Sequence, residues 1–72
     1  MTVDYDIEVK PLEPPIGSNR YRARIVHCHV IRDAKETPVD PCVGETWGVT
    51  KAEARAKLHD RMERWIATIR AP

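Results

Sequence analysis

The sequence predicts an α+β fold: a three-stranded antiparallel sheet in the order β-β-β-α, with one C-terminal helix packed on one face. Two observations predict this class. Apolar and charged residues alternate near the N-terminus and again in the middle of the chain, which is the period of a strand with one buried face. The last third of the chain repeats its apolar residues at spacings of three and four, which is the period of an amphipathic helix.

The first strand is expected over residues 3–10. Its apolar residues, which alternate with three acids and a lysine, are Val3, Tyr5, Ile7 and Val9. The next stretch contains three prolines, which remove backbone donors, and then Gly17 and Asn19, which favour a turn. Residues 10–19 are therefore expected to form a connection rather than part of the sheet.

The second strand is expected from Arg20 to Asp33, antiparallel to the first. One register matches apolar with apolar residues and acids with bases, and it sets Val9 opposite Tyr21, Ile7 opposite Ala23, Tyr5 opposite Ile25, Glu8 opposite Arg22 and Asp6 opposite Arg24. The apolar parity changes after Ile25, which a bulge near Ile25 and Val26 or a strand covered on both faces would explain.

The remaining elements are a loop, a weak strand and a helix. Residues 34–41 hold Thr-Pro and Asp-Pro pairs and are expected to form a loop. A third strand is expected over residues 42–49, short or bent because it contains two glycines. Thr50 and Glu53 form a capping box that begins a helix expected to end near Arg70.

Length and charge limit the classes of function. Seventy-two residues form a single domain, 1–72, and a chain this short buries a small core, so a partner is expected. A net charge of +1 gives no support to polyanion binding driven by total charge. The first residues are acidic and no apolar run is long enough to span a bilayer, so a cytoplasmic protein with no membrane contact is expected.

No enzyme, metal site or cofactor is expected. His27, Cys28 and His29 are metal-ligand types, but on a strand the two histidines share a face and the cysteine points away, and no zinc-ligand spacing accompanies them. The same alternation separates a Cys/His nucleophile pair. Cys28 and Cys42 are expected to be thiols in a reducing compartment, although the sequence leaves a disulfide between them open.

Two sets of residues could bind a partner. Trp65 is expected in the core, whereas Trp47 could be either a core residue or an anchor for a partner. At the start of the helix, Thr50, Lys51 and Arg55 could bind phosphate, although a solvated helix end is the simpler interpretation.

A family resemblance adds to these expectations. The run Gly48-Val49-Thr50-Lys51-Ala52-Glu53-Ala54, followed by Leu58, Met62, Trp65 and Ile66, resembles the G-x-T-x-x-E-A signature and amphipathic helix of HicB-type antitoxins. Asp40-Pro41-Cys42-Val43 is similar to the Pro-Gly-Cys segment of that family. Against the family pattern, the gap from Cys42 to Thr50 is longer, and the chain ends after the helix without the final strand and DNA-binding domain.

The resemblance implies a domain that occludes a protein partner, in that family a HicA-type toxin that cleaves RNA. Contacts with the partner are expected from the outer face of the sheet and from the helix, at Arg22, Arg24, Trp47 and Arg55. An open sheet edge also makes a homodimer reasonable.

Two alternatives come from other classes. The helix start is also similar to the last helix of double-stranded-RNA-binding domains, in which Lys51 and Arg55 would meet phosphates. That family's leading helix is missing, and the near-zero net charge lowers the expectation of nucleic-acid binding. A phage or mobile-element inhibitor that blocks a host protein is the third hypothesis.

Overall fold

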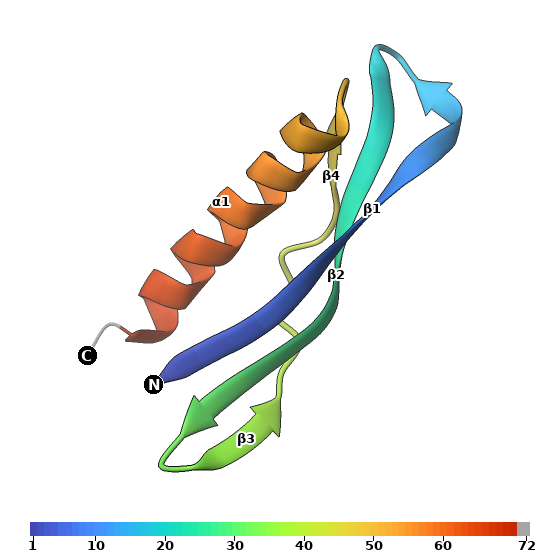
Figure 1. Cartoon of the computed structure of the whole chain (residues 1–72). Helices are drawn as coiled ribbons and strands as arrows, with labels where there is room; N and C mark the ends of the chain where they lie inside the picture. The colour runs from blue at the N-terminus through green and yellow to red at the C-terminus, as the bar shows by residue number, and fades with distance from the viewer. Residues whose placement is uncertain (71–72) are drawn as a thin grey trace.

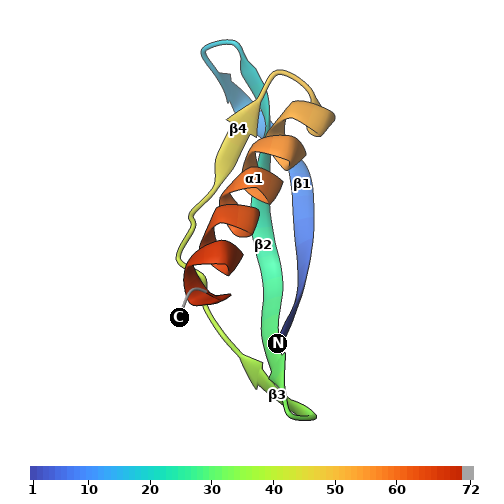
Figure 2. The ribbon, with the colours of Figure 1, turned by 90° about the vertical axis from the view of Figure 1, so that its left-hand side faces the viewer.

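The computed structural model describes residues 1–70 and confirms the α+β class (Figure 1). The elements in chain order are β1 (Thr2–Ile16), β2 (Asn19–Arg32), β3 (Lys35–Pro38), β4 (Thr46–Gly48) and α1 (Lys51–Arg70). The strands form one antiparallel sheet, and α1 lies across one face of it (Figure 2).

β2 is the central strand of this sheet. It pairs with β1 along one edge, while its other edge pairs with β3 at one end and with β4 at the other. β3 and β4 therefore occupy the same position in the sheet, one after the other, and the chain between them leaves it. β1 and its partner strand β2 run the length of a molecule that measures 44 × 20 × 17 Å.

The bulge expected in the second strand is confirmed. Asp6 pairs with His27 and Ile7 pairs with Ile25, so Val26 is the extra residue. The bulge changes which parity of β2 faces α1, and this explains why Ala23 and Cys28 are both buried although they lie five positions apart.

The expected register of the first hairpin is wrong by two residues between the turn and the bulge, and by three residues beyond the bulge. Val9 pairs with Ala23 rather than with Tyr21, and Glu8 pairs with Arg24 rather than with Arg22. The side chains of the expected pairs still lie on the expected faces. A slip of two residues keeps the alternation of the strand, and the extra residue Val26 compensates for the slip of three beyond the bulge. Its cause is the turn: β1 continues through the prolines to Ile16, which pairs with Asn19 across a tight turn containing Gly17 at φ 60°.

The next two segments also differ from expectation. Lys35–Pro38 is the short strand β3 rather than loop, because Asp33 and Ala34, at φ 49° and 62°, form a tight turn that folds the chain back onto β2. The third expected strand is reduced to β4, since the chain before Thr46 lies away from the sheet.

The helix confirms its sequence signals. The amide of Glu53 donates to Thr50 Oγ1 at 3.1 Å, as the capping box requires. Two ion pairs at i,i+4 follow along the solvent side of α1: Lys57 to Glu53 at 3.1 Å and Arg64 to Asp60 at 2.9 Å.

The core lies between α1 and the sheet and is small. Its buried apolar residues are Ala23, Cys28, Ala54, Leu58, Met62 and Ile66. Half-buried residues of β1, of β2 and of the segment before β4 surround them: Ile7, Val9, Tyr21, Ile25 and Val43. At Gly48 the start of α1 comes so close that a Cβ would lie 2.6 Å from the backbone nitrogen of Ala54. Trp65, expected in the core, is half-buried beside it.

Candidate functional site: the outer face and edges of the sheet

One face of the sheet is turned away from α1, and we call it the outer face (Figure 2). Its side chains have the opposite parity to the core residues, and in the register observed they form cross-strand pairs. The outer face consists of Asp4, Asp6, Glu8, Lys10, Arg22, Arg24, His27, His29 and Trp47. No described element covers this face, so it is open to a partner.

Ion pairs organise the middle of the outer face. Glu8 accepts a hydrogen bond from Arg24 Nε at 3.1 Å and lies 3.4 Å from Lys10 Nζ. Partial burial of the Glu8 carboxylate opposes ionisation, but the charges of Arg24 and Lys10 outweigh it and hold its pKa below the usual value. Arg22 reaches Glu45, in the segment before β4, at the longer distance of 3.8 Å. Arg22 is therefore the less neutralised of the two arginines.

Trp47 belongs to the outer face rather than to the core. It sits on β4 directly opposite Arg22, with 39% of its surface exposed. Its neighbours in β4, Thr46 and Gly48, face α1 and are buried, and the Thr46 hydroxyl donates to the Ala54 carbonyl at 2.6 Å. The short strand β4 thus fixes the face of the sheet on which the Trp47 side chain lies.

The structure brings three of the four predicted contact residues together. Arg22, Arg24 and Trp47 share the outer face, whereas Arg55 lies on α1 and its guanidinium donates to the Ile7 carbonyl of β1 at 3.4 Å. Arg55 therefore lies at the β1 edge of the sheet, apart from the other three.

The residues of the predicted phosphate site are engaged with groups of the protein itself. The Thr50 hydroxyl accepts the Glu53 amide, and Lys51 Nζ lies 5.9 Å from the centre of the Tyr21 ring. With Arg55 directed to Ile7, the two cations lie over different strands rather than together at the helix start. This geometry favours the simpler interpretation of the helix end.

Basic side chains of α1 also cover the opposite edge of the sheet, which the sequence analysis missed. Lys57 donates to the Trp47 carbonyl at 2.9 Å, and Arg61 donates to the carbonyls of Val43 and Glu45 at 3.0 and 3.2 Å. Lysine and arginine at sheet edges hinder pairing with other chains. The spacing of four between these two cations was the available signal, because it places them on one flank of the helix.

Two histidines stack on the outer face beyond the bulge. The rings of His27 and His29 are 5.1 Å apart and nearly parallel, at 19°. His27 lies within 3.6 Å of Asp4 and 3.3 Å of Asp6, and His29 Nδ1 lies 2.7 Å from Glu36. The described residues nevertheless contain no group of three or more such side chains arranged to hold a metal ion.

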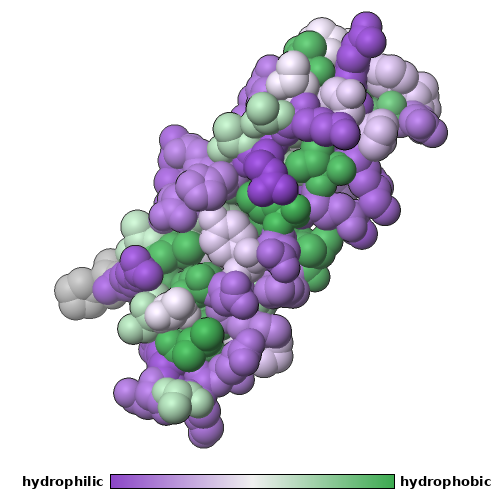
Figure 3. Space-filling model, viewed as in Figure 1, coloured by the Kyte–Doolittle hydropathy of each residue, from purple (hydrophilic) through white to green (hydrophobic). Residues whose placement is uncertain are grey.

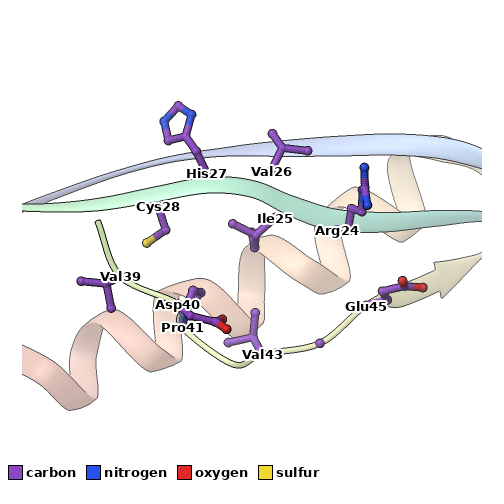
Figure 4. Close-up of a pocket in the computed structure, with 11 residues that line it drawn as sticks. Arg24, Ile25, Val26, His27, Cys28, Val39, Asp40, Pro41, Val43 and Glu45 are labelled. Atoms are coloured by element: carbon purple, nitrogen blue, oxygen red, sulfur yellow. The ribbon is translucent and has the colours of Figure 1, made fainter. Parts of the chain in front are cut away.

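Both cysteines are free thiols. Cys42 is exposed, and Cys28 is buried beside a pocket of about 420 Å³ between β2 and the chain that joins β3 to β4 (Figure 4). Burial, and then the charges of Asp4 and Asp40, raise the pKa of the Cys28 thiol, so it stays protonated near neutral pH. Figure 4 also shows His27 on the opposite side of β2 from Cys28, which keeps the imidazole away from the sulfur.

An apolar groove of about 490 Å³ lies between the β2–β3 hairpin and the C-terminal end of α1. Val30, Val39, Trp65 and Ile69 form its walls. Figure 3 shows apolar residues gathered along the junction between α1 and the sheet. The groove explains why Trp65 is only half-buried.

Comparisons with protein-family models, with curated proteins and with solved structures find no match for this chain. The fold and the site define a class, a two-layer α+β domain with one open sheet face. The resemblance to HicB-type antitoxins stays a prediction. Among residues 1–70, no helix has the length and apolar character needed to cross a membrane.

Proposed function

We propose that this protein is a non-enzymatic binding module that occludes a protein partner through the outer face of its sheet. The resemblance to HicB-type antitoxins suggests the kind of partner, a small basic toxin that cleaves RNA. The module would act stoichiometrically, by covering the surface that the toxin uses on RNA.

The position of Trp47 is the observation that carries this proposal. Trp47 keeps 39% of its surface exposed although this short chain has few large side chains for its core, as expected of a residue that a partner covers. It stands beside Arg22, and tryptophan and arginine are the residue types most enriched among the energetic centres of protein interfaces. The paired Arg24 and Glu8 beside them give a polar rim of fixed charge.

The positions of the basic side chains favour a protein partner over duplex RNA. Phosphate binding needs several bases directed at one surface. On the outer face Arg24 is paired with Glu8 and Arg22 lies near Glu45, while Lys51 and Arg55 lie over Tyr21 and Ile7. A titration with duplex RNA at low salt should therefore show no saturable binding.

The proposal predicts that a small basic protein is encoded near this chain, and co-expression of the two proteins tests it. The expected result is relief of that protein's toxicity and a complex that survives gel filtration. Trp47→Ala should weaken the complex by about 30-fold or more, the loss typical of a central interface residue. Arg64→Ala, on the solvent side of α1, serves as the matched control and should leave the affinity unchanged.

Two results would defeat the proposal. One is a neighbouring toxin whose activity is unaffected by a folded, abundant form of this chain. The other is a complex whose affinity is the same with Trp47→Ala as with Arg64→Ala, because the outer face would then lie outside the interface.

A further inference from the structure

We infer that the free edge of β1 is a docking site for a strand in which basic and apolar residues alternate. This inference deepens the proposed function and rests on it for the origin of the strand, which would belong to the occluded partner. The site itself consists of residues of β1, with Arg55 of α1 at its edge.

β1 has one edge without a strand. In the described part of the chain it pairs only with β2, so its other edge is open over most of its 15 residues. An open edge presents unpaired backbone N–H and C=O groups, which an extended peptide can use to extend the sheet.

The direction of these backbone groups follows from two observations. Arg55 reaches the Ile7 carbonyl from the side of β1 away from β2, and alternate residues of a strand direct their backbone groups to the same edge. Pro11 has the same parity as Ile7, and proline is tolerated in an edge strand where its missing N–H would face solvent. Val3, Tyr5, Ile7 and Val9 are therefore the residues whose backbone groups point to the open edge.

The side chains of β1 define the chemistry of the incoming strand. On the outer face β1 carries Asp4, Asp6 and Glu8, of which Glu8 is already neutralised by Arg24 and Lys10. Asp4 and Asp6 lie beside histidines of β2, with His27 near both and His29 opposite Asp4, and their side chains are 60% and 67% exposed. On the other face β1 carries half-buried Tyr5, Ile7 and Val9. A strand with lysine or arginine on one face and apolar residues on the other complements both.

The same charges disfavour a second copy of this chain as the occupant. An antiparallel β1 pair centred on Tyr5 sets Asp4 against Asp6, and a pair centred on Asp6 sets Asp4 against Glu8. A pair centred on Ile7 matches Asp4 with Lys10 but still sets Asp6 against Glu8. Like charges directly opposite one another destabilise a sheet. The homodimer expected from the open edge is therefore a competing outcome of the test rather than the proposal.

The contact of Arg55 with β1 leaves the edge accessible to an incoming strand. The guanidinium covers the Ile7 carbonyl at 3.4 Å, near the limit for a hydrogen bond, and at an exposed position. An incoming backbone N–H can replace it without exposing a buried group. The edge is thus protected in the free chain and available to a partner that brings a full set of donors.

A titration of isotope-labelled protein with a capped peptide of alternating lysine and valine, followed by amide NMR shifts, tests the inference. The expected shifts lie along β1, and the amides of Tyr5, Ile7 and Val9 should gain protection from exchange. A peptide with glutamate in place of lysine should bind at least tenfold more weakly. Shifts away from β1, equal binding of both peptides, or no binding would overturn the inference.

Two matched comparisons separate charge from backbone pairing. Asp6→Lys should weaken binding about fivefold or more, whereas Asp60→Lys should not, because Asp60 lies on α1, although its side chain is 59% exposed against 67% for Asp6. The backbone groups that point to the open edge belong to the apolar residues of β1, so in an antiparallel pair they bond with the valines of the peptide, which lie directly opposite. N-methylation of the valines should therefore abolish binding, and N-methylation of the lysines should not. Equal effects within either comparison would contradict the site.

The outcomes also distinguish this inference from the proposed function. Peptide binding at β1 without any toxin that this chain neutralises would keep the docking site and remove the function. Toxin neutralisation without peptide binding would keep the proposed function and remove the docking site. Concentration-dependent shifts at β1 in the absence of peptide, with a dimer in sedimentation, would assign the edge to a second copy and overturn the inference.

Discussion

Gly48→Ala should destabilise the domain through a backbone collision. The added Cβ would lie 2.6 Å from the Ala54 nitrogen and 3.1 Å from its Cα, well inside van der Waals contact. Both atoms are backbone, so no side chain can rotate away, and either the start of α1 or β4 must shift. Overpacking of this kind costs about 1–3 kcal/mol.

That cost is large for this chain. A single core in so short a domain rarely supplies more than about 3–5 kcal/mol, so the variant should lose a substantial part of its free energy of unfolding. The melting temperature should fall by about 4–8 °C for each kcal/mol. The shift of α1 would also strain the 2.6 Å hydrogen bond from Thr46 to the Ala54 carbonyl.

Urea denaturation followed by tryptophan fluorescence and circular dichroism measures the loss. Ala54→Gly introduced together with Gly48→Ala should not restore stability, because the collision is with backbone atoms rather than with the Ala54 methyl group. A Gly48→Ala variant with the wild-type midpoint would refute the close packing of α1 on β4, on which the orientation of Trp47 depends.

Three further predictions concern the cap, the thiols and the pH dependence. Thr50→Ala removes the hydroxyl that accepts the Glu53 amide and should cost about 1 kcal/mol in chemical denaturation. Cys42 should react with a thiol reagent rapidly, and Cys28 only as fast as the protein opens, because Cys28 is buried and its pKa is raised; equal rates in the folded protein would contradict this. The pKa of Glu8 is lower in the folded than in the unfolded chain, so the ionised carboxylate stabilises the fold above the unfolded pKa of about 4.3, and this stabilisation is lost as the pH falls below that value. Glu8→Gln should therefore make the free energy of unfolding less dependent on pH in the acid range.

The elements with strong periodic signals were predictable from the sequence. The helix, its Thr50 cap and the bulge near Val26 each follow from local patterns of residue type. The register of the first hairpin was wrong because it depends on the turn, and the prolines before Gly17 suggested an earlier end to the strand than the structure shows.

Tertiary contacts set the remaining features. β3 exists because two residues with positive φ reverse the chain after β2, and neither Asp33 nor Ala34 is a strong signal for that conformation. Arg55 was expected to contact the partner from the helix, but its place at the β1 edge depends on how α1 crosses the sheet. The glycine at position 48 was expected to weaken a strand, whereas the structure shows that it admits the helix.

Hydrogen exchange of this chain, alone and bound to the protein partner proposed above, tests the central claim most directly. The account predicts that binding slows exchange in β1 and in β4 around Trp47, and leaves the exposed side of α1 around Arg64 unchanged. Protection confined to α1, or a bound state whose sheet exchanges as fast as the free chain, would contradict it.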